Sequence, residues 1–160
     1  MVDSDVAELI GSLLDDPGPL CDALSRYPQT VIHGDWKLGN LGILPEAARR
    51  IVLLDWGQVG PAPPAVELGW YLAVNSARMP VSKEEAITIY RDGLQKRLGD
   101  RFDESWWQPQ LDLSLLGAFL QLGWPKTLGA ARGETEAVRQ RERSELIWWS
   151  ARVREGARWL

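Results

Sequence analysis

Residues 31–57 hold the one histidine of the sequence and its most specific pattern of polar residues. The pattern reads His-Gly-Asp from His33 to Asp35, then four further residues and Asn40, and an apolar run that follows ends on Asp55. Asn and Asp side chains supply the oxygen ligands that Mg²⁺ prefers, and one or two protein ligands leave room for phosphates and water. Asp35 would then stay free to accept a proton from an alcohol. The spacing therefore predicts metal-assisted chemistry at a hydroxyl group.

The same residues resemble the aminoglycoside phosphotransferase and choline kinase family of the protein-kinase-like superfamily. The catalytic loop of that family reads His-Gly-Asp-x4-Asn, and its metal-binding Asp follows a short strand; protein kinases carry the related His-Arg-Asp-x4-Asn and Asp-Phe-Gly motifs. The resemblance implies that Asp35 is the catalytic base. It also implies that Asn40 and Asp55 hold Mg²⁺ and thereby a bound nucleotide, ATP or GTP. Lys37 would reach the transferred phosphoryl group as a point charge, and His33 would brace the loop.

A second interpretation of the segment stays open at this point. His33 and Asp35 could instead hydrogen-bond backbone groups of a tight turn, as short polar side chains commonly do. The chain would then be an unrelated helical structural protein. An all-helical structure without a hairpin after Asn40 would favour that interpretation.

Composition limits the class of protein. The chain has 160 residues, 45% hydrophobic and 25% charged, which is ordinary for one globular domain. The net charge is −4, and the arginines near the C-terminus alternate with glutamates, so we expect a solvated helix face and no nucleic-acid binding. The single Cys21 rules out an intrachain disulfide. The acidic N-terminus and the lack of a long apolar run predict no signal peptide, no membrane span and a cytoplasmic location.

Apolar periodicity, turn residues and caps predict an α+β chain that is mainly helical, with a small β-hairpin at the catalytic loop. The expected helices cover 4–15, 20–27, 67–75, 82–98, 111–123 and about 134–159. The expected strands are 30–32, 41–44 and 51–54, with a turn between the last two that contains Pro45 and residues 47–50. Residues 57–64 should form a rigid loop, and the chain should break around 102–109. Glu67 is interpreted as an acid placed near a helix start by the helix dipole.

The expected organisation is one domain, 1–160, that resembles only the C-terminal lobe of such a kinase. Residues 1–30 would be leading helices, 31–57 the catalytic loop and metal-binding hairpin, and 64–160 a helical substrate-binding subdomain. No Gly-rich loop and no strand Lys of a nucleotide-binding lobe is found, so we expect that N-terminal lobe to be absent. The chain alone would then be weak or inactive, with an exposed apolar face that self-associates or recruits an N-lobe partner. The alternative is a non-catalytic binding or interaction module that keeps the fold.

The substrate is left open as a small molecule with a hydroxyl group. Nine tryptophans are expected to be mostly core, with some able to face a cationic substrate. Candidate counter-charges for such a substrate are Asp103, Glu104, Asp112 and Glu134. Other members of the family phosphorylate neutral alcohols, so both substrate types remain.

Overall fold

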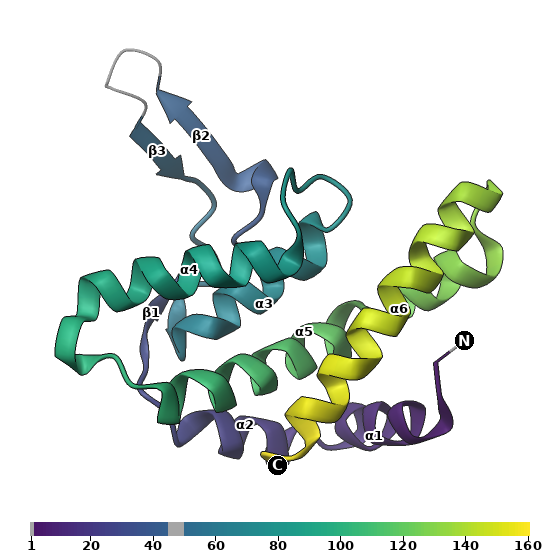
Figure 1. Cartoon of the computed structure of the whole chain (residues 1–160), viewed down its shortest axis with the longest axis horizontal. Coiled ribbons are helices and arrows are strands. Elements are labelled where there is room, and N and C mark those ends of the chain that lie inside the picture. Colours follow the sequence, from purple (N-terminus) through teal and green to yellow (C-terminus); the bar gives the residue numbers. More distant parts are fainter. Residues whose placement is uncertain (1, 45–49) are drawn as a thin grey trace.

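The computed structural model describes residues 2–44 and 50–160 and is built mainly from helices (Figure 1). The helices are α1 Ser4–Asp15, α2 Gly18–Ser25, α3 Pro64–Asn75, α4 Lys83–Leu98, α5 Glu104–Arg132 and α6 Glu136–Ala157, with short 3₁₀ turns η1 Leu38–Asn40 and η2 Gly99–Arg101. The strands are β1 Thr30–Ile32, β2 Leu41–Leu44, β3 Arg50–Leu53 and β4 Gly60–Ala62. The prediction of a mainly helical chain with a small hairpin is confirmed. The expected turn around Pro45 lies outside the described residues.

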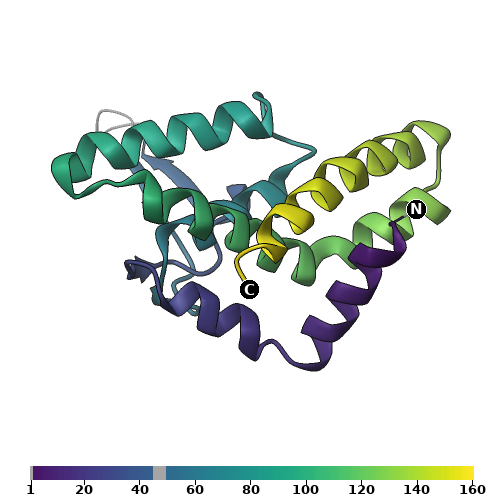
Figure 2. The ribbon, with the colours of Figure 1, turned by 60° about the horizontal axis from the view of Figure 1, so that its bottom comes forward.

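Helix α5 is the centre of the molecule. It packs against α6 and α3 over long stretches and also contacts α1 and α2. Figure 2 shows α4 on one side of α5 and the α1–α2 pair on the other. The core residues that fill these interfaces include Leu68, Leu72, Trp107, Leu113, Leu116, Trp149 and Val153. Within 2–44 and 50–160 no helix combines the length and apolarity needed to cross a membrane.

One close backbone approach fixes α3 against α5. A Cβ added to Gly69 of α3 would lie 2.7 Å from the carbonyl oxygen of Ser114 in α5. Since a glycine lacks that atom, the two helices can approach this closely. Helix α3 is therefore seated firmly on the central helix, which matters because α3 supports the candidate site.

Local signals in the sequence account for the ends of α4. The Ser82 hydroxyl accepts a hydrogen bond from the Glu85 backbone N–H at 3.1 Å, as in the Ser-x-x-Glu pattern of a capping box. Gly99 ends the helix with a φ of 54°, a conformation that favours glycine.

Two predictions about loops are wrong. The proline-rich stretch 57–64 contains strand β4, which pairs antiparallel with β1 so that Pro61 lies opposite Val31. A two-stranded ribbon leaves half of the N–H groups of each strand unpaired, so a proline is tolerated there. The expected break at 102–109 is limited to Phe102 and Asp103, because α5 starts at Glu104 and continues through Pro109.

The helical start of α5 has a physical explanation. Asp103 accepts a hydrogen bond from the Ser105 backbone N–H at 2.8 Å and so caps the helix. Pro109 removes one helical hydrogen bond, but Trp107 and Leu111 on the same turns are buried. Burial of these side chains offsets the lost bond.

The expectation that most tryptophans belong to the core is wrong. Trp107 and Trp149 are fully buried, whereas Trp56, Trp124 and Trp159 are 50%, 69% and 38% exposed. The other four are half-buried. Of these four, Trp106 and Trp148 pack against the core, and Trp70 contacts the candidate site.

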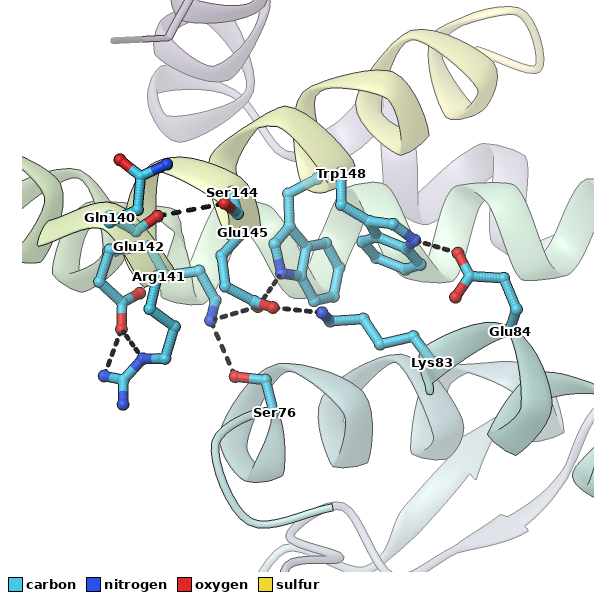
Figure 3. Close-up of polar contacts among 11 residues, drawn as sticks. Ser76, Lys83, Glu84, Gln140, Arg141, Glu142, Ser144, Glu145 and Trp148 are labelled. Atoms are coloured by element: carbon cyan, nitrogen blue, oxygen red, sulfur yellow. Dashed lines mark hydrogen bonds and ion pairs between the residues drawn. The ribbon is translucent and has the colours of Figure 1, made fainter. Parts of the chain in front are cut away.

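A buried ion cluster joins four helices at the end of α3. Glu145 of α6 accepts hydrogen bonds from Lys83 of α4 and, at 3.1 Å, from Lys126 of α5 (Figure 3). Lys126 also donates to the Ser76 hydroxyl at 3.1 Å, and the Trp149 indole donates to Glu145 at 3.3 Å. The C-terminal dipole of α3 favours the extra positive charge of this Glu145 cluster, because carbonyl oxygens point toward it.

Candidate active site

The hairpin brings Asn40 and Asp55 to the same end. Strands β2 and β3 pair antiparallel with Leu41 opposite Leu53. One step further along the ladder, the Leu54 backbone N–H donates to the Asn40 carbonyl at 2.9 Å. Figure 1 shows this open end of the hairpin turned toward the helices. Residue 55 therefore follows directly after the backbone partner of residue 40, although fifteen positions separate residues 40 and 55 in the sequence.

The turn before Asp35 depends on glycine. Gly34 has a φ of 80°, and a Cβ at that position would lie 2.2 Å from the Gln58 carbonyl oxygen. An L side chain would therefore meet both an unfavourable backbone conformation and a direct clash. The Gly of the His-Gly-Asp motif thus lets the loop pass against the chain that follows β3.

His33 holds the loop through both ring nitrogens. Its Nε2 lies 2.9 Å from the Leu54 carbonyl oxygen, and its Nδ1 lies 3.2 Å from the Asp35 backbone nitrogen. A carbonyl only accepts and a backbone N–H only donates, so the Nε2–H tautomer satisfies both bonds. The ring also contacts Trp56 at 4.7 Å between centroids. His33 is buried and links the loop of residues 33–40 to the end of β3.

Three donors converge on the buried carboxylate of Asp35. Oδ2 accepts from the Lys37 ammonium at 2.5 Å and from the Asn40 amide at 2.9 Å. Oδ1 accepts from the Trp70 indole at 3.1 Å. The Lys37 hydrogen bond is the largest effect on the pKa of Asp35, and with those from Asn40 and Trp70 it outweighs burial and lowers that pKa. Asp35 is therefore charged and held in one orientation.

Helix α3 supports the whole loop. Glu67 accepts hydrogen bonds from the backbone N–H groups of His33 and Gly34. Trp70 lies one turn further along and binds Asp35, as described above. Asn75, two turns beyond Glu67, accepts from the Leu38 backbone N–H at 3.1 Å.

Sequence reasoning missed these three contacts. Glu67 stands in the first turn of α3, as its interpretation as a dipole-favoured acid requires, but its carboxylate also binds the catalytic loop. Trp70 and Asn75 were not singled out. A partial signal was present, since Glu67 and Trp70 are three residues apart and fall on one helix face; Asn75 lies five residues beyond Trp70, about 140° further around the helix.

The available ligand atoms fit Mg²⁺. The Asn40 amide nitrogen donates to both the backbone carbonyl and the carboxylate of Asp35, each at 2.9 Å, which leaves its oxygen Oδ1 for a cation. Asp55 is exposed and has a φ of 64°, a left-handed conformation that Asp tolerates better than most residues and that is frequent at functional sites. Among the described residues no group of three His, Cys, Asp or Glu could hold a metal alone. Two oxygen ligands suit a metal that completes its shell with phosphates and water.

The structure thus brings four of the five predicted site residues into one hydrogen-bonded group: His33, Asp35, Lys37 and Asn40. Asp55 joins the group through its backbone neighbour, because Leu54 bonds both His33 and Asn40. The turn-only interpretation expected an all-helical structure, whereas the hairpin after Asn40 is present.

The phosphotransferase enzyme family is the family whose model matches the chain, over residues 5–109. That span contains the catalytic loop, the hairpin, α3 and α4. No curated protein and no solved structure matches the chain.

Proposed function

This chain belongs to the phosphotransferase enzyme family, and we propose that its Asp35 site transfers the terminal phosphoryl group of ATP or GTP to a hydroxyl of a small molecule. The observation that carries the proposal is the arrangement of Asp35, whose carboxylate is buried and held by Lys37, Asn40 and Trp70. A carboxylate fixed in this way can orient an alcohol without reorganising during the reaction.

Asp35 acts on the acceptor. Lys37 is 41% exposed at its side chain, the most exposed member of the hydrogen-bonded group, so it can leave Oδ2 and follow the terminal phosphate. The acceptor hydroxyl then donates its hydrogen bond to Oδ2. As its oxygen bonds to the γ-phosphorus, the bond from that phosphorus to the β–γ bridging oxygen breaks and the nucleoside diphosphate leaves. Asp35 takes the hydroxyl proton, late in the reaction because its pKa is low.

Asn40 and Asp55 would hold Mg²⁺, which when bound supplies positive charge that neutralises the phosphate oxygens. The chain itself contributes the oxygen Oδ1 of Asn40 and the carboxylate of Asp55. His33 keeps these two residues close to Asp35, because it bonds Leu54 on one side and Asp35 on the other.

We further propose that the chain is a protein-kinase-like C-terminal lobe and that a nucleotide-binding lobe, in the same longer protein or in a partner chain, completes the site. The outer end of the hairpin supports this. Ile43 and Ile51 are cross-strand partners and are 70% and 67% exposed. Exposed apolar side chains grouped in this way often mark a surface on which another domain or chain packs. Because the proposed nucleotide-binding lobe would complete the site, the chain by itself should be weakly active.

The nucleotide part of the proposal is tested by calorimetric titration of Mg²⁺-ATP into the chain. Binding heat should be lost in Asp55→Ala and retained in Asp22→Ala, which changes an exposed acid on α2 far along the sequence. Equal heat in the wild type and in Asp55→Ala would contradict the assignment of Asp55.

The transfer part is tested with the chain joined to a nucleotide-binding lobe. Asp35→Asn should lower the rate of phosphate transfer to the acceptor by about 10²–10⁴-fold, the usual contribution of a positioned acid or base. Wild-type turnover in Asp35→Asn would remove Asp35 from the mechanism. Nucleotide binding without any transfer would instead support the non-catalytic binding module.

A further inference from the structure

We propose that the acceptor alcohol carries a neutral apolar group, an aromatic ring or a branched aliphatic chain, which binds in a cavity beside Asp35. This inference rests on the proposed function, because it assigns the cavity to the acceptor of the same site. The cavity has a volume of about 340 Å³ and is formed by the catalytic loop, α3, α4 and the segment between those helices. Its lining includes Trp36, Tyr71, Met79, Ala86, Ile89 and Tyr90.

The position of the cavity connects it to the catalytic carboxylate. Trp36 directly follows Asp35 in the loop, and Tyr71 directly follows Trp70, whose indole binds Asp35. Trp36 and Tyr71 also contact each other, with 4.5 Å between ring centroids. Asp35, which carries the carboxylate, and Trp70, which binds it, are therefore each followed in the sequence by a residue that lines this cavity.

The chemistry of the lining favours an uncharged ligand. All nine lining residues are aromatic or aliphatic, and none carries a charge. Tyr90 donates its hydroxyl hydrogen to the Pro64 carbonyl at 3.0 Å, and burial raises its pKa to about 12, so it stays neutral. Placing an ammonium group against such a wall would cost solvation energy, and none of the residues that line it carries a carboxylate to offset that cost.

Packing among the rings limits the cation–π contacts that the cavity can offer. An ammonium group needs the open face of a ring, and the contact between Trp36 and Tyr71, with 4.5 Å between their centroids, covers part of one face of each ring. The acids considered as counter-charges are engaged elsewhere: Asp103 caps α5, Glu104 pairs with Arg91, and Asp112 binds Gln108 and Trp159. Glu134 lies at the far end, between α5 and α6.

The size of the cavity sets the size of the apolar group. A volume of about 340 Å³ lies near the lower end of the range of small-molecule sites, roughly 300–1,000 Å³. A single ring or a short branched chain fits this space, whereas a multi-ring sugar would extend out of it. The cavity therefore selects one apolar substituent and leaves the hydroxyl outside, toward the loop.

The test uses the two methionines of the chain as reporters. With ¹³C-methyl methionine the protein gives two signals, from Met1 and from Met79, and Met79 lines the cavity. Met79→Leu assigns them. Titration with 2-phenylethanol should shift the Met79 signal saturably, with a dissociation constant at least tenfold lower than that of choline. Tighter binding of choline, or a Met79 signal that neither probe moves, would overturn the inference.

Two substitutions test whether 2-phenylethanol binds in this cavity and not elsewhere on the protein. Ile89→Asp places a charge at its mouth on a residue that is 59% exposed, and it should weaken 2-phenylethanol at least fivefold while strengthening choline. Ile147→Asp makes the same change on α6, where Ile147 is 75% exposed, and should leave both affinities unchanged. Equal effects of the two substitutions would overturn the inference.

Asp35→Asn separates this inference from the proposed function. The variant should still shift the Met79 signal with 2-phenylethanol, because the apolar contacts of the cavity do not include Asp35. Loss of phosphate transfer in this variant together with absence of 2-phenylethanol binding in the wild type would refute the cavity alone. Binding of 2-phenylethanol together with full transfer by Asp35→Asn would refute the catalytic assignment alone.

Discussion

Two carboxylates in this protein have nearly the same chemical surroundings. Asp35 accepts hydrogen bonds from a lysine, an amide and an indole, and Glu145 accepts from two lysines and an indole. The pKa of both is lowered. For Asp35 the Lys37 bond is the largest effect, whereas for Glu145 burial pushes the pKa up and the bonds and charges of Lys83 and Lys126 outweigh it.

The two clusters differ in where their donors come from and how exposed they are. Lys37 and Asn40 lie within five residues of Asp35, and Lys37 is 41% exposed. Lys83 and Lys126 come from two other helices, 62 and 19 positions from Glu145, and are 11% and 9% exposed. A lysine that is exposed can leave its partner, whereas a buried lysine cannot do so without a large desolvation cost. We infer that the first cluster is arranged to open to a substrate and the second to hold helices together.

The largest expected effect concerns the Glu145 cluster. Glu145→Ala leaves Lys83 and Lys126 buried without their shared partner and should lower the free energy of unfolding by about 3–5 kcal/mol. Urea denaturation at neutral pH measures this change. Glu155→Ala is the matched control on the same helix, because Glu155 pairs with the exposed Arg158 and should change stability by less than about 1 kcal/mol. Equal losses in the two variants would mean that the Glu145 cluster does not hold the helices.

A second, smaller effect is expected at the loop of the Asp35 cluster. Gly34→Ala meets both a φ of 80° and the Gln58 carbonyl, so it should cost about 1–3 kcal/mol of stability and displace Asp35. Gly39→Ala is the control in the same loop, since a Cβ there has no neighbour within 4 Å. Urea denaturation of both variants measures the stability change. Fluorescence of the nearby Trp36 and Trp70, or the transfer rate, reports on the loop, and identical behaviour of the two alanine variants would contradict the role of Gly34.

The pH dependence of stability should separate Glu145 from another buried acid. A lowered pKa means that the stabilising contribution of Glu145 is fully present above its ordinary pKa of 4.5 and is lost as the pH falls through the folded value. The stability advantage of the wild type over Glu145→Gln should therefore shrink below about pH 4.5. Burial instead raises the pKa of Asp112, so the advantage of the wild type over Asp112→Asn should shrink as the pH rises. Urea denaturation midpoints of the wild type and the two variants between pH 3 and 7 measure both stability differences. If the two differences changed with pH in the same direction, the assignment of the two pKa shifts would be contradicted.

How well the sequence predicts each region depends on how far apart in the sequence its contacting residues are. The loop and hairpin are local: Asp35, Lys37 and Asn40 lie within six consecutive residues, and β2 pairs with β3, the next strand along the chain, so motif spacing and strand pattern were sufficient. The pairing of β4 with β1 joins residues about thirty positions apart, and prolines in β4 hid it. Trp70 and Asn75 support the loop from a helix more than thirty positions away, and a single sequence gives no measure of such contacts. The Glu145 cluster depends on the packing of four helices and was not predicted.

The smallest expected effect tests the mobility of Lys37. Lys37→Met should change the free energy of unfolding by less than about 1 kcal/mol, because the lysine is partly exposed and water replaces it around Asp35. Lys126→Met should cost several times more, since it removes a buried charge from Glu145. The pKa of Asp35 should nevertheless rise in Lys37→Met, because the Lys37 bond is the largest cause of its lowering. Urea denaturation and a ¹³C-carboxyl NMR titration measure the two quantities. If Lys37→Met destabilised the chain as much as Lys126→Met, Lys37 would be a structural ion-pair partner, and Asp35 could not release it to receive a substrate hydroxyl.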